Sequence, residues 1–215
     1  MTRTLAIFDI DGTLLRLPGA ERRFARYLAE NAALPAGSHA RFAWHSALGF
    51  PRHGRLVLKR NVAYLSGLAL VALERHAEAW VDEVLADALV PAAWERLREH
   101  HAKGDATVLL SGTPAFLAAA IGVALGVSRA RGSDVPIEDG VLRGPFFDRH
   151  LFGAEKLCIA EDLCRELGEG CRVVSYADSF SDLPLLEWSD GAVVVNPDRR
   201  LGAEAGRRGW EVLTG

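Results

Sequence analysis

The sequence predicts an α/β protein with a mostly parallel sheet, helices on both faces of the sheet, and an all-helical segment inserted after the first strand. From residue 106 onward, short apolar runs alternate with helical patterns, which is typical of parallel strands joined by crossover helices. Residues 5–8 form another run that is apolar at successive positions, as in a strand covered on both faces. Between these regions the chain has helical spacing and no strand-like alternation. We therefore predict a core of residues 1–16 and 91–215 and a helical cap of residues 17–90.

Turn-forming residues divide the predicted cap into several helices. A turn is expected at residues 16–19, after which Phe24, Tyr27 and Leu28 recur at helical spacing. Pro91 suits the first turn of a helix that runs to residue 101. The breaks are predicted at residues 35–37 and 50–54, and the helices between them at residues 42–48, 57–73 and 78–89.

Strands and helices alternate in the rest of the chain. Strands are predicted at residues 106–110, 129–132, 172–176, 192–195 and, at an edge of the sheet, 210–213. Helices are predicted from residue 115 and over residues 156–167, 183–188 and 199–208. Glu138, Asp139 and Gly140 separate two short extended runs, which indicates a hairpin with its turn at these residues.

Two carboxylates follow the first predicted strand directly. Asp9 and Asp11 stand two positions apart, and Gly12 then lets the backbone turn. Open α/β sheets bind their ligands at the carboxyl ends of the strands. Two neighbouring carboxylates repel each other and lose hydration there, and a hard divalent cation would offset both costs. The alternative, that one Asp merely caps a helix, accounts for only one of the two.

Polar residues also follow two other predicted strands. Ser111, Gly112 and Thr113 come after one strand, and Asp178 and Asp182 come after another. Strand ends of a parallel sheet share one edge, so these groups are expected to converge with the first two carboxylates. Hydroxyl, glycine and carboxylate groups around a metal are what phosphoryl transfer requires. Taken alone, Ser111–Thr113 and Asp182 can also be read as helix caps.

Lys156 is a cation at the start of a predicted helix. A positive charge at a helix N-terminus opposes the helix dipole, so the position is locally unfavourable. An anion bound nearby would justify it, whereas the alternative is an ordinary solvated lysine on the surface.

Together, these four pieces resemble the four motifs of the haloacid dehalogenase-like (HAD) superfamily. The first is Asp9-Ile10-Asp11-Gly12-Thr13, and the others follow in order over essentially the whole chain. The helical insert after the first motif, the hairpin and the Asp-Leu-Pro-Leu-Leu run at 182–186 resemble the phosphoserine phosphatase-like branch, subfamily IB. The resemblance implies a Rossmann-like, doubly wound core with a helical cap, and a Mg²⁺-dependent phosphomonoester hydrolase that acts on a small phosphorylated metabolite.

The resemblance also implies a role for each motif residue. Asp9 would attack phosphorus and form an aspartyl-phosphate. Asp11 would act as general acid and base, and its presence favours a phosphatase over the dehalogenase and ATPase members. Asp9, the backbone carbonyl of Asp11 and Asp178 would bind Mg²⁺. Asp182 would hold metal-bound waters or Lys156. Ser111, Gly112 and Lys156 would bind the phosphate oxygens.

One departure from that branch bears on the substrate. Phosphoserine phosphatases carry a Glu shortly after the first motif, and here the matching position is Pro18, with Glu21 as the nearest acid. We therefore predict that L-phosphoserine is not the best substrate. The cap cations, which face either an anionic leaving group or solvent, are Arg52, His53, Arg55, Lys59 and Arg60. The aromatic residues expected in the cap core are Trp44, Tyr64, Trp80 and Trp94.

Composition narrows the possible partners and location. The 215 residues carry a formal net charge of −3, so no overall basic character points to nucleic acid. Cys158, Cys164 and Cys171 lack metal-binding spacing and are expected to be reduced thiols. The longest apolar stretch, residues 115–127, is too short to span a bilayer, so we expect no stable membrane anchor. We also expect a cytoplasmic protein that is a monomer or a homodimer. Three other functions stay open: phosphoserine phosphatase proper, a phospholipid head-group phosphatase, and a non-catalytic phosphate-binding protein on the same scaffold.

Overall fold

A six-stranded parallel sheet forms the centre of the computed structural model, which describes residues 3–17 and 19–215, with the backbone alone at residue 55. The strands lie in the order β3-β2-β1-β6-β7-β8, and every neighbouring pair is parallel. The chain therefore winds outward from β1 in both directions, which confirms the predicted doubly wound fold. The strands are β1 (Thr4–Phe8), β2 (Ala106–Pro114), β3 (Arg129–Ser133), β6 (Arg172–Ala177), β7 (Gly191–Val195) and β8 (Glu211–Leu213).

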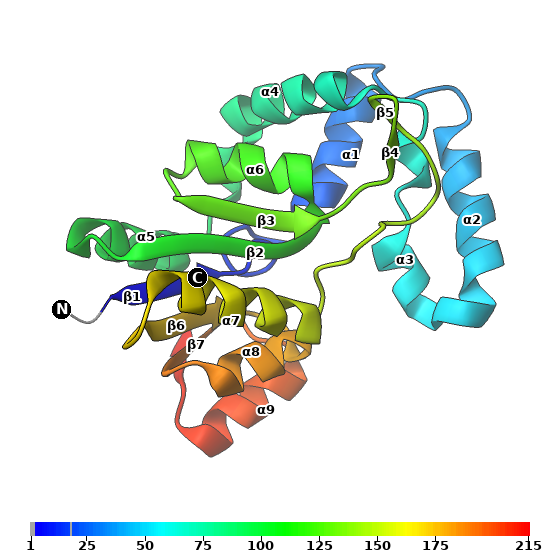
Figure 1. The fold of residues 1–215 in the computed structure, drawn as a ribbon. Coiled ribbons are helices and arrows are strands. Elements are labelled where there is room, and N and C mark those ends of the chain that lie inside the picture. The colour runs from blue at the N-terminus through cyan, green and yellow to red at the C-terminus, as the bar shows by residue number, and fades with distance from the viewer. Residues whose placement is uncertain (1–2, 18) are drawn as a thin grey trace.

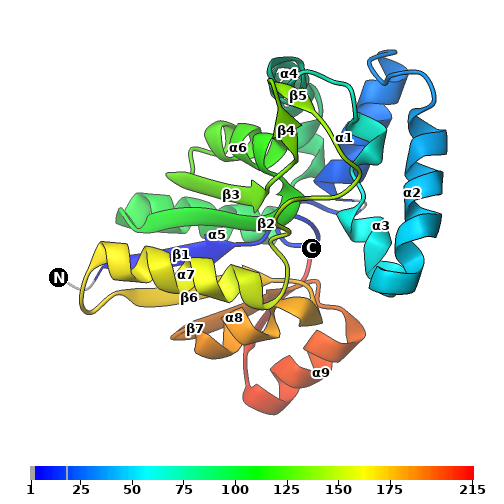
Figure 2. The ribbon, with the colours of Figure 1, turned by 45° about the vertical axis from the view of Figure 1, so that its right-hand side comes forward.

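Helices cover both faces of this sheet (Figures 1 and 2). Alternate residues of β1 point to opposite faces. Ala6 and Phe8 belong to one apolar cluster with residues of the helices on one side, whereas Leu5 and Ile7 belong to another on the opposite side. Burial of each large apolar side chain contributes about 1.5–3 kcal/mol. The first cluster includes α4 (Leu70–Ala88), α5 (Pro91–Lys103) and α6 (Ala115–Ala124), and the other face is covered by α7 (Ala154–Leu167), α8 (Leu183–Trp188) and α9 (Arg199–Arg208).

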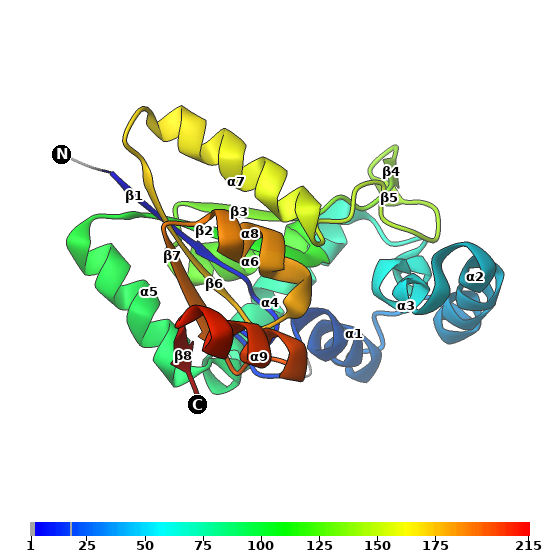
Figure 3. The same ribbon diagram turned by 90° about the horizontal axis from the view of Figure 1, so that it is seen from below.

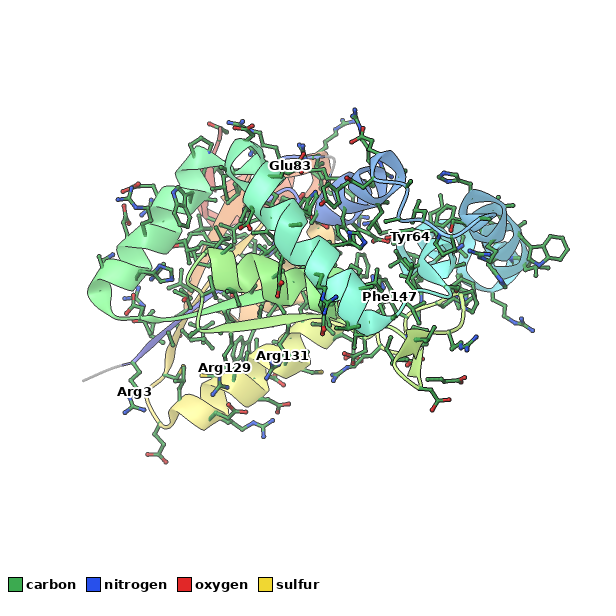
Figure 4. All side chains as sticks on the ribbon, turned by 90° about the horizontal axis from the view of Figure 1, so that it is seen from above. Arg3, Tyr64, Glu83, Arg129, Arg131 and Phe147 are labelled. Carbon is green, nitrogen blue, oxygen red and sulfur yellow. The ribbon has the colours of Figure 1, made fainter. Side chains whose placement is uncertain are left out.

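Polar contacts at the edge of the sheet join it to one covering helix. Arg129 of β3 forms an ion pair with Glu166 of α7. Figure 4 shows Arg129 and Arg131 extending from β3 on the side of α7.

The described residues of the predicted cap form helices and turns, with isolated β-bridges at Asn61, Ala69 and Leu89. Its elements before α4 are α1 (Ala20–Glu30), α2 (Ser38–His53), η1 (Gly54–Leu56), α3 (Val57–Arg60) and η2 (Ala63–Leu65). Phe24 of α1 packs against Trp80 of α4 and Phe116 of α6, so α1 is anchored to the helices above the sheet. By contrast, α2 and α3 lie far from the sheet (Figures 1 and 3). We call residues 38–65 the outer lobe; the division of the chain at residues 16/17 and 90/91 stays a prediction.

Two helix boundaries in this region were predicted wrongly. Residues 57–73 are not one helix, because the buried Asn61 side chain donates to Phe42 O and Ser46 Oγ, both at 2.8 Å, and accepts from Ala63 N. These bonds compete with continuation of the helix. Nor does α2 break at Pro51: it runs on to residue 53, because a proline near the end of a helix removes only one late hydrogen bond.

The predicted hairpin consists of β4 (Ile137–Glu138) and β5 (Val141–Leu142), with Asp139 and Gly140 both at positive φ in its turn. It hydrogen-bonds to the segment that joins the outer lobe to α4. Leu142 N donates to Leu68 O and Leu70 N donates to Gly140 O, both at 2.8 Å. A segment from the second half of the chain therefore holds the helical insert in place. Figure 4 shows Tyr64 and Phe147 on the side of the molecule where these parts meet.

Candidate active site

The candidate site lies where the winding of the sheet reverses, between β1 and β6. Phe8 and Tyr176 are paired at the ends of these strands, and Asp9 and Asp178 follow them. Asp9 N donates to Tyr176 O at 3.0 Å, which fixes the backbone of Asp9 beside β6. Ligands of open α/β sheets bind at such a reversal.

Gly12 allows the segments that follow β1 and β6 to approach each other. Its φ is +85°, and its N–H donates to Leu15 O at 2.7 Å. A Cβ atom at this position would lie 2.1 Å from Asp178 Oδ2. Both the turn and the close position of Asp178 therefore require glycine here.

Asp11 is held by two hydrogen bonds. Its carboxylate accepts from Ala20 N at 2.6 Å and from Thr113 Oγ1 at 3.1 Å. Burial, followed by the charge of Asp9, raises the pKa of Asp11 above its ordinary value. A carboxyl group with a raised pKa is suited to exchange protons near neutral pH.

Lys156 connects the first strand end to the third. Its Nζ donates to Asp9 Oδ1 and to Asp182 Oδ2, both at 2.8 Å, and only 4% of the residue is exposed. Burial lowers the pKa of Lys156, but Asp182 and Asp9 together raise it above its ordinary value, so the amine stays charged. The surface alternative for Lys156 is therefore wrong.

Asp178 and Asp182 complete an acidic group around this lysine. Burial, then the charges of Asp9 and Asp182, raise the pKa of Asp178 to about 8. Burial also raises the pKa of Asp182, to about 6, although Lys156 opposes this change. In addition, Asp182 Oδ1 is buried and has no hydrogen-bond partner among the described residues. Lys156 therefore compensates only part of the negative charge of this acidic group.

The oxygen groups fit a hard divalent cation. Asp9 and Asp178 supply carboxylates, and the backbone carbonyl of Asp11 is a further oxygen at the same turn. In the described parts of the chain, no three His, Cys, Asp or Glu side chains group as a metal site. The Asp11 carboxylate accepts hydrogen bonds from Ala20 N and Thr113 Oγ1, so the backbone carbonyl is the oxygen of this residue that could serve as a metal ligand.

Ser111 and Gly112 lie within β2, which runs further than predicted, to Pro114. Ser111 is buried, and its Oγ donates to Thr113 Oγ1 at 3.1 Å. All seven predicted site residues line one cavity of about 390 Å³. They are Asp9, Asp11, Ser111, Gly112, Lys156, Asp178 and Asp182.

The cavity also includes Glu21, the acid that the sequence places nearest to the position of the missing Glu, and His150, to which the sequence assigned no role. Glu21 of α1 is half-buried there and accepts a hydrogen bond from Tyr64 OH at 3.2 Å. Burial, then the charge of Asp11, raise the pKa of Glu21 to about 8. His150 stacks between Phe147 and Phe152, and burial, then Arg60 and Lys59, lower its pKa to about 4.

Residues of the outer lobe differ in their relation to the cavity. Lys59 lines it and lies 4.9 Å from the ring centroid of Phe152. His53 packs against Phe146, and Arg52 is exposed. Pro18 and the Arg55 side chain lie outside the described residues.

Only part of the predicted aromatic cap core is correct. Trp80 and Tyr64 are buried, and Trp94 packs against the main core, but 63% of Trp44 is exposed. Trp44 was therefore predicted wrongly, because its side chain lies on an exposed side of α2.

The doubly wound sheet and the carboxylates at its reversal, which line one cavity of about 390 Å³, are consistent with a hydrolase of the α/β class. The model of the haloacid dehalogenase-like hydrolases matches residues 6–187, and the chain belongs to this family. The predictions of this family and of a phosphatase are both confirmed.

Several known proteins are similar to this chain. A phosphoserine phosphatase of Mycobacterium tuberculosis is 30% identical and covers 96% of this chain and 69% of its own length. A histidinol-phosphatase of Neisseria meningitidis is 27% identical, and the match covers 98% of both chains. A Bordetella pertussis protein of unknown function is similar in structure, with a TM-score of 0.81, 27% identity and 99% of both chains covered.

Within residues 3–17 and 19–215, no helix is both long enough and apolar enough to cross a bilayer.

Proposed function

We propose that the protein hydrolyses a small phosphomonoester with the help of Mg²⁺, through a phosphorylated Asp9. The observation that supports this most directly is Lys156, which bridges Asp9 and Asp182 at 2.8 Å inside a cavity that also contains Ser111, Gly112 and Asp178. A cation placed among a nucleophile and phosphate-binding groups is the arrangement that phosphoryl transfer uses.

The metal would be held by Asp9, Asp178 and the backbone carbonyl of Asp11, with Asp182 outside this set. When bound, Mg²⁺ supplies positive charge that offsets the repulsion between carboxylate and phosphate. The raised pKa of Asp178 and the unpartnered Oδ1 of Asp182 support a cation at this position.

The protein's own groups would then perform the two chemical steps. Asp9 attacks phosphorus while Asp11 donates its proton to the departing alkoxide, and Asp11 later takes a proton from the water that attacks the phosphorylated Asp9. The Ser111 hydroxyl, the Gly112 N–H and Lys156 bind the phosphate oxygens, whose negative charge they stabilise.

Removal of divalent metal is expected to stop turnover of p-nitrophenyl phosphate, and added Mg²⁺ should restore it. The test is the hydrolysis rate after treatment with a chelator, then after Mg²⁺ and, separately, Ca²⁺ are added back. Full activity in chelator would contradict the metal assignment. No turnover under any metal condition would instead favour the phosphate-binding scaffold without catalysis.

For the substrate, we propose a phosphate ester whose leaving group carries an amino group and an apolar or aromatic part. Glu21 provides an acid for the ammonium, and Leu17, His150 and Phe152 provide an apolar and aromatic wall. Phosphoserine and histidinol phosphate, for which two relatives are named, both carry an amino group. The carboxylate of phosphoserine, however, would enter a cavity rich in acids, so we still expect phosphoserine not to be the best substrate.

Glu21→Gln is expected to lower kcat/KM for histidinol phosphate by about 10–100-fold, because the ammonium group of the bound substrate loses its charged partner. p-Nitrophenyl phosphate has no amino group and should change little. A suitable control is Glu30→Gln, at the exposed end of the same helix. Equal losses on both substrates would show that Glu21 is structural, and phosphoserine as the best substrate would contradict the proposed leaving group.

A further inference from the structure

The outer lobe has an unusual charge pattern. Residues 31–73 contain no Asp or Glu, although the whole chain has a net charge of −3. The cations in this stretch are Arg41, Arg52, Arg55, Lys59 and Arg60. This stretch therefore has a net positive charge because it lacks acidic residues, whereas the chain as a whole is acidic.

The same lobe exposes large apolar side chains. Among the described residues, five of the ten exposed large apolar side chains lie between residues 44 and 58. They are Trp44 (63%), Leu48 (54%), Phe50 (55%), Leu56 (48%) and Leu58 (56%). Single exposed apolar residues are ordinary, but a group of this size on neighbouring short helices indicates an interaction surface.

Helix α2 presents part of this surface as a continuous stripe. Trp44, Leu48 and Pro51 follow at i, i+4 and i+7, so they lie along one side of the helix, and all three are exposed. Figures 1 and 3 show α2 and α3 at the extremity of the molecule, away from the sheet. The stripe is therefore accessible to a large, flat partner.

The described cations of residues 31–73 stand outside the ion pairs that the described residues form. Within the described part of the chain, the ion pairs include none of Arg41, Arg52, Lys59 and Arg60. By contrast, Arg26 on α1 pairs with Glu30. Of these four, Arg41 donates hydrogen bonds to neighbouring backbone and hydroxyl groups, and Lys59 lines the catalytic cavity. The exposed Arg52 is the cation among them that is available to an anionic surface.

We propose that the outer lobe binds reversibly to membranes containing anionic lipids, through the apolar side chains of α2 and α3 and the cation Arg52 beside them. Aromatic and leucine side chains flanked by arginine and lysine suit the interface between lipid head groups and acyl chains. A second copy of this chain fits less well, because it would place cations against cations. The inference does not depend on the proposed substrate.

The test is sedimentation of the full-length protein with vesicles. We expect the protein to pellet with phosphatidylcholine vesicles that contain about one-third phosphatidylglycerol, to stay in solution with phosphatidylcholine alone, and to be released by high salt. The double variant Trp44→Glu, Leu48→Glu should lower the bound fraction at least about tenfold. Val123→Glu is the matched control, because Val123 is 82% exposed on α6, far along the chain from the lobe.

A charge variant makes the test independent of the apolar substitutions. Arg52→Glu should also weaken binding to the anionic vesicles, whereas Lys103→Glu, at the exposed end of α5, should not. None of these residues lines the catalytic cavity, so turnover of p-nitrophenyl phosphate and the melting temperature serve as checks on folding.

Three results would overturn the proposal. The first is wild-type protein that stays in solution with anionic vesicles, and the second is equal binding to neutral vesicles. The third is vesicle binding that is reduced neither by the double variant Trp44→Glu, Leu48→Glu nor by the single variant Arg52→Glu. A dimer in analytical ultracentrifugation that Trp44→Glu dissociates, without vesicle binding, would assign the surface to a second copy instead.

Discussion

Asp9→Asn is expected to abolish turnover, by about 10⁴-fold or more, because an amide cannot replace a carboxylate nucleophile. Asp9 lies at the end of β1, and its Oδ1 accepts a hydrogen bond from Lys156 at 2.8 Å. The substitution preserves the size of the side chain, so the fold should persist. The measurement is kcat for a phosphomonoester in the presence of Mg²⁺, together with the circular dichroism spectrum.

Asp139→Asn is a matched control for Asp9→Asn. Asp139 is exposed in the hairpin turn and has a φ of +49°, a conformation that Asn tolerates well. This variant should retain full activity. Activity of Asp9→Asn close to the wild-type value would rule out a phosphorylated Asp9.

Asp11→Asn is expected to lower kcat by about 10²–10⁴-fold, the usual range for the loss of a general acid–base group. An amide oxygen can still accept the hydrogen bond that Ala20 N donates, so the substitution removes mainly the proton that Asp11 transfers. The loss should be smaller for p-nitrophenyl phosphate than for an alkyl phosphate, because p-nitrophenolate departs without protonation.

The decrease of kcat with an alkyl phosphate, divided by the decrease with p-nitrophenyl phosphate, separates a chemical role of Asp11 from a structural one. Thr113→Val provides a useful comparison, because it removes the hydroxyl that Asp11 accepts from while leaving the carboxylate in place. An equal decrease for both substrates in Asp11→Asn would mean that Asp11 only holds the turn toward Ala20.

The fold was predictable from the sequence because local patterns agree with tertiary burial. Residues 5–8 are apolar at every position since β1 is covered on both faces, and the strand–helix alternation after residue 106 reports the crossovers directly. The helix breaks near residues 61–69 were not predictable in this way. There the conformation depends on Asn61, whose side chain bonds to residues of α2.

The residues of the candidate site also divide into those that the sequence predicts and those that it does not. The positions of Asp9 and Asp178 were predictable because each directly follows a parallel strand, whereas Ser111 lies inside β2, which continues to Pro114. Glu21 and His150 reach the cavity from a helix and a loop outside the sheet, and no spacing rule connects them to it. Trp44 was misplaced because a helical pattern does not reveal whether another element covers a given face.

The hairpin β4–β5 has a consequence for the order in which the protein reaches its final form. Its backbone bonds to Leu68 and Leu70 join residues that are distant in sequence. During synthesis the helical insert leaves the ribosome well before residues 137–142. The Leu68 carbonyl and the Leu70 amide therefore stay without these partners until the hairpin has been made. The insert therefore reaches its final arrangement late in translation, although its sequence is among the first to be made.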